Sequence, residues 1–132
     1  MFEYRFSVRG YELDSYNHVN NAVYLNYYEQ ARWEIMRTTG LLEKLIADKI
    51  FLVVTEIKIR YSKEACLFDN LLISTKIEFT GPYVMFKQRM INEDSGIKLS
   101  TAEVKTLPLN RERVPCSIPA GFQILLNNAD RN

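Results

Sequence analysis

The chain has 132 residues, of which 47% are hydrophobic and 25% are charged, and its net charge is +1. This length is enough for one domain with a hydrophobic core, and the composition argues against a disordered or fibrous chain. A charge this close to zero excludes a global field that attracts nucleic acid or anionic lipid, so an anion site must be a local cluster. Two cysteines and one histidine are too few for a disulfide scaffold or a multi-histidine metal site.

The first ten residues alternate between apolar and polar side chains, as in a half-buried strand. The apolar members are Phe2, Tyr4, Phe6 and Val8. Glu3 and Arg5 interrupt the segment, so it lacks the continuous apolar stretch of a signal peptide. No later segment approaches the ~20 apolar residues that span a bilayer. We therefore expect a cytoplasmic protein.

A polar loop follows and ends in Asn20 and Asn21, either of which is a good N-cap for a helix. From residue 21 to residue 39, apolar side chains recur with helical spacing. Gly40 then supplies a C-terminal cap. Residues 41–48 predict a short second helix or a helical turn.

The next part of the chain contains four strand-like runs. They cover residues 51–61, 71–79, 83–91 and 97–107. In the first run, apolar side chains alternate from Phe51 through Ile59 to Tyr61, which predicts one continuous apolar face. The last run changes phase between Leu99 and Ala102, which indicates a bulge.

The end of the chain contains Pro108, Pro115 and Pro119, which predict an irregular segment. The order of one strand, one long helix and four strands predicts an α+β fold. We expect a curved antiparallel sheet of about five strands, wrapped around the long helix. Without a visible linker or repeat, we expect one domain over residues 1–132.

The segment from Val8 to Arg32 carries a set of closely spaced motifs. It contains an acidic pair, Glu12 and Asp14, then His18-Val19-Asn20-Asn21, then Tyr24, and an E-x-A-R sequence from Glu29 to Arg32. In these motifs the chain resembles the hotdog-fold acyl-CoA thioesterases of the 4-hydroxybenzoyl-CoA thioesterase-like branch and the related acyl-ACP thioesterases. The resemblance implies a hotdog fold and the hydrolysis of an acyl thioester to a free acid and a thiol.

Thioester hydrolysis needs a group that activates water or attacks the carbonyl, and donors for the oxygen on which negative charge accumulates. It needs no cofactor or metal. The resemblance implies that Asp14 is the catalytic carboxylate, as general base or nucleophile, and that the Asn21 N–H polarises the carbonyl. A helix N-terminus suits this task because its N–H groups are free. The alternative for Asp14 is a loop or capping residue.

His18 has two interpretations. It could orient the water or bind the carboxylate, or it could fix the backbone near the start of the helix. Tyr16, Asn17 and Asn20 lie in the same loop and are candidate substrate-binding residues. The acyl-ACP members carry a catalytic Asn at the position of Tyr16, and Asn17 is displaced from it by one residue.

Tyr24 is a further candidate for substrate binding, with packing in the core as its alternative. Arg60 and Lys63, together with Lys87 and Arg89, are candidates for the phosphates of CoA. The alternative for each of these cations is a solvated strand face.

The resemblance also implies an assembly, because one hotdog unit does not enclose this kind of site. We expect a homodimer with the two sheets joined edge to edge and the acyl pocket between the subunits, or a homotetramer of two such dimers. Trp33, on the polar side of the long helix, favours a subunit contact, with an isolated exposed tryptophan as the alternative.

The expected substrate is an acyl-CoA or acyl-ACP, with no nucleic-acid partner. A second hypothesis is a non-catalytic module that binds acyl thioesters. A third is a hotdog dehydratase, which needs a His and a carboxylate in another arrangement.

Overall fold

The computed structural model describes residues 1–129, and residues 130–132 of the expected domain lie outside this range. The elements in chain order are β1 (Phe2–Ser7), the 3₁₀ turn η1 (Gly10–Glu12), α1 (Asn21–Thr39), α2 (Leu41–Asp48), β2 (Phe51–Tyr61), β3 (Asn70–Thr80), β4 (Tyr83–Asn92), β5 (Lys98–Leu109) and α3 (Phe122–Ala129). The strands form one sheet in the order β1-β3-β4-β5-β2, and all neighbours are antiparallel. Strands β1 and β2 are therefore its two edges.

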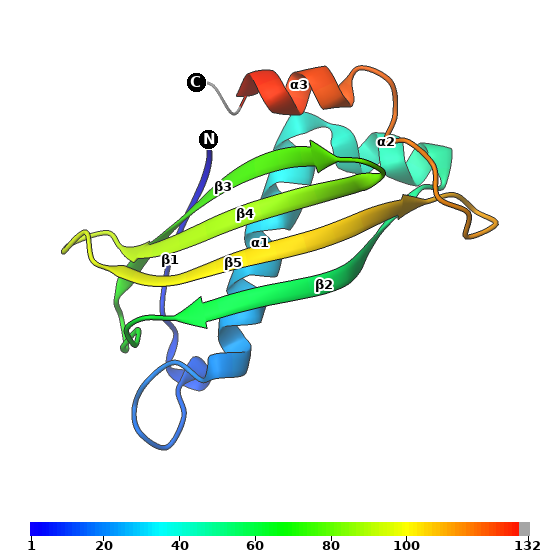
Figure 1. Ribbon diagram of the computed structural model, residues 1–132. Coiled ribbons are helices and arrows are strands. Elements are labelled where there is room, and N and C mark those ends of the chain that lie inside the picture. The colour runs from blue at the N-terminus through cyan, green and yellow to red at the C-terminus, as the bar shows by residue number, and fades with distance from the viewer. Residues whose placement is uncertain (130–132) are drawn as a thin grey trace.

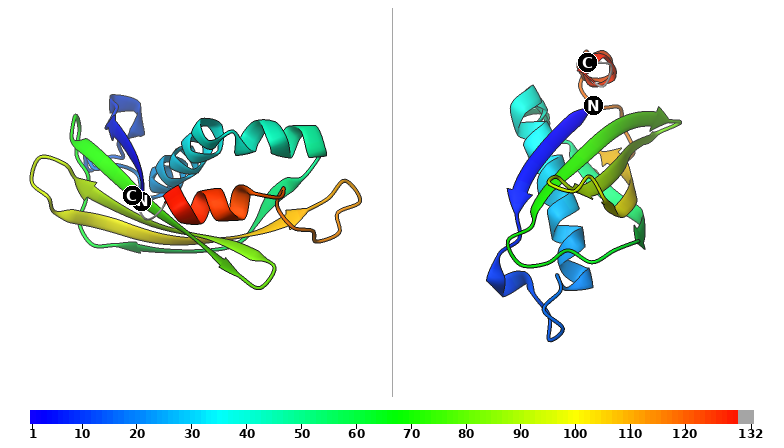
Figure 2. Two further views of the ribbon diagram at one scale, coloured as in Figure 1. Left: turned by 90° about the horizontal axis from the view of Figure 1, so that it is seen from above. Right: turned by 90° about the vertical axis from the view of Figure 1, so that its left-hand side faces the viewer.

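The sheet curves around α1, the longest helix (Figure 1). All three α-helices lie on the concave side of the sheet (Figure 2). In the part of the chain that the structure describes, no helix covers the outer face. The arrangement confirms the predicted α+β hotdog fold, a curved antiparallel sheet wrapped around one long helix.

Two clusters of buried side chains join α1 to the sheet. The first contains Tyr24, Tyr27, Tyr28, Ala31, Leu71, Ile73 and Met90, among others. The second contains Ile35, Leu41, Leu45, Ile77, Phe86, Val104 and Leu126, among others. Each large apolar side chain that becomes fully buried contributes roughly 1.5–3 kcal/mol to folding. The first cluster packs on the N-terminal part of α1 and the second on its C-terminal part. The helix is therefore held against the sheet along its length.

The predicted caps of the long helix are confirmed. The Asn20 side chain is the N-cap, because its Oδ1 accepts a hydrogen bond from the Ala22 N–H at 2.9 Å. At the other end, Gly40 adopts a φ of 82° and donates its N–H to the Arg37 carbonyl. This left-handed conformation costs glycine little, and it allows α2 to begin directly after α1.

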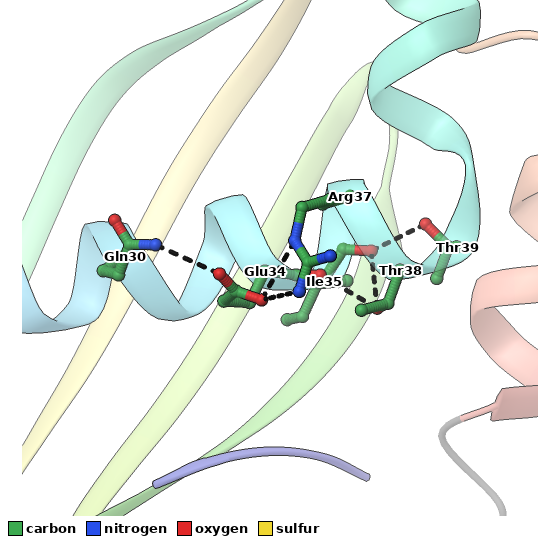
Figure 3. A network of polar contacts seen from close by, with 6 residues as sticks. All are labelled: Gln30, Glu34, Ile35, Arg37, Thr38 and Thr39. Atoms are coloured by element: carbon green, nitrogen blue, oxygen red, sulfur yellow. Dashed lines mark hydrogen bonds and ion pairs between the residues drawn. The ribbon is translucent and has the colours of Figure 1, made fainter. Parts of the chain in front are cut away.

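The last turns of α1 carry a network of polar contacts (Figure 3). The Glu34 carboxylate accepts from the Gln30 amide at 3.3 Å and from Arg37 Nη2 at 2.6 Å. The Thr39 hydroxyl donates to the Ile35 carbonyl at 2.7 Å. These contacts support the C-terminal end of the helix before the turn into α2.

Bulges interrupt two of the strands. Pairing between β5 and β4 passes from Ser100–Met90 to Lys98–Ile91, so Leu99 is the extra residue and the bulge predicted there is confirmed. Pairing between β2 and β5 skips Thr55, which the sequence did not indicate.

The Thr55 bulge changes which side chains of β2 face the core. Leu52 packs on the core before the bulge, and Ile59 packs on it afterwards. Phe51 and Val53 are exposed. The prediction of one continuous apolar face from Phe51 to Tyr61 is therefore wrong, because the extra residue reverses the alternation.

The prediction of an irregular C-terminal segment is wrong over its last part, where α3 forms. Phe122 and Leu126, one helical turn apart, pack on the second core cluster. Their i,i+4 spacing provides an apolar face after the last proline, Pro119, and tertiary packing stabilises this short helix. Within residues 1–129, no helix has both the length and the apolar character that crossing a bilayer requires.

Candidate active site

The loop before α1 closes as a tight turn around Asp14. Its Oδ1 accepts hydrogen bonds from the Tyr16 N–H at 2.8 Å and the His18 N–H at 3.3 Å. The Asp14 N–H donates to the His18 carbonyl at 2.8 Å. Among the described residues, no hydrogen bond takes up Oδ2. Asp14 therefore shapes its loop with one carboxylate oxygen and keeps the other available.

Tyr16 and Asn17 form the tip of this turn. The Tyr16 side chain is 79% exposed. Asn17 has a φ of 63°, a left-handed conformation that Asn adopts more readily than most residues. Asn17 thus has a conformational role in the turn, while the substrate-binding role of both residues stays a prediction.

His18 contacts Asp14 through its backbone. Its imidazole points elsewhere, with Nε2 3.9 Å from Glu64 Oε1, an ion pair when the ring is protonated. The backbone of His18 also pairs with Cys66. These contacts fit the interpretation of His18 as a residue that fixes the backbone, and its action on water stays a prediction.

The start of α1 leaves one amide without a partner. Asn20 caps the helix, since its Oδ1 takes up the Ala22 N–H and its carbonyl takes up the Val23 N–H. Within residues 1–129, no hydrogen bond takes up the Asn21 N–H. The Asn21 carbonyl accepts from the Tyr61 hydroxyl of β2 at 2.8 Å. The free Asn21 N–H therefore lies at the positive end of the helix dipole. The hydrogen bond from Tyr61 of β2 holds Asn21 in place.

Asn20 caps the helix with its side-chain oxygen and contacts the loop through its backbone. Its side-chain oxygen is the capping group, and its own N–H donates to the Glu12 carbonyl at 2.9 Å. Asn20 thus positions the neighbouring Asn21, and its substrate-binding role stays a prediction.

Glu12 anchors the loop that precedes α1 to Arg9 and Tyr27. The sequence did not indicate this role. The Glu12 carboxylate is buried and accepts from the Arg9 N–H at 2.7 Å, the Arg9 guanidinium and the Tyr27 hydroxyl at 2.8 Å. Burial alone would raise the pKa of Glu12, but the hydrogen bonds from Arg9 and Tyr27 outweigh it and hold that pKa below its usual range. Burial and the neighbouring Glu12 carboxylate raise the pKa of Tyr27. The acidic pair was visible in the motif, but the partners of Glu12 were not.

Tyr24 lies in the core, as its alternative interpretation states. It is buried, and its hydroxyl oxygen accepts from the Ala65 N–H at 2.9 Å. Its ring meets the Tyr61 ring edge-on, with 5.1 Å between centroids. Tyr24 therefore joins α1 to the segment after β2, and its role in substrate binding stays a prediction.

The candidate phosphate-binding cations are divided between two places. Arg60, Lys87 and Arg89 line a shallow depression of about 780 Å³ on the outer face of the sheet. Lys63 lies in the loop after β2, where its N–H donates to the Leu99 carbonyl. The sheet separates the depression from α1, so the structure brings three of the four cations together, away from the Asp14 loop.

An apolar cavity of about 520 Å³ lies between α1, α2 and β2. Its lining includes Trp33, Met36, Leu45, Ile50, Leu52 and Phe86. Trp33 is 45% exposed. The cavity lies where β2 begins, whereas Asn21 contacts the residue where β2 ends. The sequence did not indicate the cavity, because its walls come from separate elements.

The sequence matches the profile of the thioesterase-like superfamily over residues 8–126. The chain belongs to this superfamily. It is 42% identical to the long-chain acyl-CoA thioesterase FadM of Escherichia coli K12 over 71 residues, which is 54% of each chain. It is 32% identical to the acyl-CoA thioester hydrolase YbgC of Escherichia coli O6:H1 over 129 residues, 91% of this chain and 96% of YbgC.

The fold of this thioesterase-like protein agrees with the same relationship. The crystal structure of YbaW from Escherichia coli superposes with a TM-score of 0.86 at 28% identity, covering 96% of this chain and 97% of YbaW. The resemblance to hotdog thioesterases is thereby confirmed. In the part of the chain that the structure describes, no three His, Cys, Asp or Glu side chains form a group that could hold a metal ion.

Proposed function

We propose that the protein hydrolyses acyl-CoA thioesters with Asp14 and the Asn21 N–H as its two catalytic groups. Thioester hydrolysis is the reaction of its family, and the chain is an enzyme of this class. One observation carries the assignment of residues: the carboxylate with a free oxygen and the amide without a partner stand at the two ends of one loop. A carboxylate and a positioned donor are the two parts that acyl transfer to water requires.

The reaction has two routes through Asp14. As a general base, its free oxygen takes a proton from a water molecule that attacks the carbonyl carbon. The C–S bond then breaks, the thiolate leaves and takes up that proton, and the free acid remains. As a nucleophile, the same oxygen forms a mixed anhydride, the C–S bond breaks, the thiolate leaves, and water then hydrolyses the anhydride. On both routes the carbonyl oxygen gains negative charge, and the Asn21 N–H binds it. Losing one such donor typically costs about 2.7–4 kcal/mol of transition-state stabilisation.

The active form that we propose is a dimer formed through β2. This edge strand exposes apolar side chains along its length. They include Phe51, Val53, Val54, Ile57 and Tyr61. An edge strand also presents unpaired N–H and C=O groups, which a second copy of β2 satisfies in antiparallel pairing.

Antiparallel pairing gives each acyl cavity a catalytic loop from the other copy. The cavity lies at the start of β2, and the Tyr61–Asn21 contact lies at its end. Two antiparallel copies bring the end of one strand beside the start of the other. The cavity of one protomer then faces Asp14 and Asn21 of the partner subunit, and the site is incomplete without both.

An apolar cavity suits a hydrocarbon acyl group, and the related FadM acts on long-chain acyl-CoA. We therefore propose a fatty acyl-CoA as the substrate, with acyl-ACP as the alternative carrier. Arg60 and Lys63 stay candidates for the phosphates of the carrier. The protein would act without a cofactor, in the cytoplasm.

A thiol-release assay over a panel of acyl-CoA and acyl-ACP substrates tests the proposal. We expect turnover with acyl-CoA, and a fall in kcat of about 100-fold or more for Asp14→Asn. The matched control is Asp94→Asn, which changes an aspartate of the β4–β5 turn and should keep full activity.

Other outcomes would contradict the proposal. Full activity of Asp14→Asn would remove Asp14 from the mechanism. Tight binding of acyl-CoA without turnover across the panel would favour a non-catalytic binding module. Hydration of an enoyl thioester without release of thiol would favour a dehydratase.

A further inference from the structure

Arg32 is a buried cation with few partners. It lies on the inner side of α1 and is only 8% exposed. Its Nη1 donates to Gln88 Oε1 of β4 at 2.9 Å. Within the described chain, no other hydrogen bond takes up the remaining N–H groups of its guanidinium, which carries five.

Gln88 is fixed as the acceptor of this hydrogen bond. Its Nε2 donates to the Tyr28 carbonyl and to the Thr75 hydroxyl oxygen, both at 3.1 Å. Because both amide hydrogens are used, the amide cannot rotate without losing them, and Oε1 stays directed at Arg32. The guanidinium is therefore held in one position by a rigid, buried neighbour.

The charge of Arg32 is not balanced by a direct ion pair among residues 1–129. Burial lowers the pKa of Arg32, and the negative charge of Glu29 opposes this shift only in part. Glu29 lies one turn earlier and is exposed. A buried charge without a close partner is costly, so proteins normally pair it or use it to bind a ligand.

Arg32 is one of the residues that line the acyl cavity. Arg32 lines the same cavity as the apolar Trp33 and Met36, and as the polar Glu29 and Thr106. In the described chain, no hydrogen bond joins the guanidinium to either of these two polar side chains. A fixed group of N–H donors in a mostly apolar pocket sets the orientation and the identity of a ligand.

We propose that Arg32 determines the acyl specificity of the enzyme by binding an acceptor oxygen carried by the acyl group itself. An acyl chain with a carboxylate at its far end, or with a hydroxyl or keto oxygen, then fits the cavity better than a plain chain of equal length. A carboxylate also supplies the missing counter-charge and forms the strongest contact with a guanidinium. The inference rests on the proposed thioesterase activity.

The test compares kcat/KM for matched acyl-CoA substrates, plain, hydroxylated and terminally carboxylated, over a range of chain lengths. We expect the wild-type enzyme to prefer an oxygenated chain to the plain chain of the same length. Arg32→Met should lower kcat/KM for that chain about 10- to 100-fold, and leave the plain chain within about twofold. The control Arg37→Met, at an exposed position of the same helix, should change neither.

A second variant tests the positioning of the guanidinium. Gln88→Met removes the acceptor, so the same preference should fall while the plain chain remains a substrate. If Arg32→Lys restores the preference for carboxylated chains alone, the positive charge at this position is sufficient to bind the carboxylate, and the planar guanidinium is not required.

The outcomes separate this inference from the proposed function. Hydrolysis of plain chains with no wild-type preference for any oxygenated chain overturns the role of Arg32, even if the variants fail to fold. Equal losses for both substrate classes in Arg32→Met also overturn it, because they indicate a structural role. Failure to hydrolyse any acyl thioester overturns the proposed function instead.

Discussion

Glu12 and Asp14 are two carboxylates in one loop, and their surroundings give them different tasks. Glu12 is buried and its oxygens are occupied by Arg9 and Tyr27. Asp14 is half-buried and uses one oxygen for its own turn. A saturated carboxylate is a structural anchor, while a carboxylate with a free oxygen can accept a proton or attack a carbon.

Because the pKa of Glu12 is lowered in the fold, we expect the stability of the protein to depend on pH. The pKa of Glu12 is lower in the folded protein than in the unfolded chain, where it is about 4.3. Glu12 therefore stabilises the fold fully above that value, and the contribution is lost as the pH falls through the lowered folded-state pKa. Glu12→Gln should reduce the free energy of unfolding at pH 7 by about 2 kcal/mol, and the difference from wild type should narrow below about pH 4.

Thermal unfolding of both proteins across this pH range checks the prediction. Glu112→Gln, at an exposed loop position, is the control and should follow the wild type. A difference that is constant between pH 7 and pH 3 would show that Glu12 acts through packing alone.

The Asn20 cap predicts linked losses of stability and activity. Asn20→Ala removes the acceptor of the Ala22 N–H and should cost about 1 kcal/mol in urea unfolding. Because the cap also positions Asn21, kcat should fall more than stability alone explains. Asn26→Ala, exposed on the same helix, is the control. Normal kcat in a destabilised Asn20→Ala would separate the cap from catalysis.

At the scale of elements, the Asp14 loop, α1 and the strands were predictable because their signals are local. Asn20 and Gly40 stand next to the helix that they cap, so spacing alone identifies them. The Arg32–Gln88 contact joins residues 56 positions apart, and no local pattern indicates it. The bulge at Thr55 was not predicted for a related reason. It is defined by the pairing of β2 with β5, and the alternation of apolar and polar residues on either side of Thr55 looks regular.

The edge strand β2 carries the prediction about assembly. Ile57 is 39% exposed near the middle of β2, where a two-fold axis would place it close to its own copy. Ile57→Lys then sets two positive charges against each other, and the dimer should dissociate. Light scattering after gel filtration measures the mass, and thiol release should fall in parallel because each site needs both copies.

Ile124→Lys is the matched control, since Ile124 is exposed on α3, away from β2. It should leave mass and activity unchanged. A monomeric wild-type protein with full activity would contradict both the dimer and the shared site.

At the scale of the whole molecule, we predict that two inactive variants regain activity when they form a mixed dimer, because each site is shared between two copies. Asp14→Asn keeps its cavity, and Met36→Trp fills the cavity from α1 while keeping Asp14. A mixed dimer then holds one intact site, formed by Asp14 of one copy and the cavity of the other. Co-expression in equal amounts should give mixed dimers in about half of the population, and about one quarter of wild-type activity.

Each variant alone should be close to inactive, which is the control for the mixture. No recovery in mixtures that contain mixed dimers would place the whole site within one protomer.

The two edges of the sheet differ in length and in chemistry. Strand β2 runs from Phe51 to Tyr61 and begins with apolar residues, whereas β1 runs only from Phe2 to Ser7. On β1, Arg5 pairs with Glu3 at 2.8 Å and with Glu93 at 3.0 Å. Charges on a short edge oppose the addition of another strand. Once β2 is covered, only charged edges remain, so growth of the sheet stops at a closed pair and does not continue into fibres.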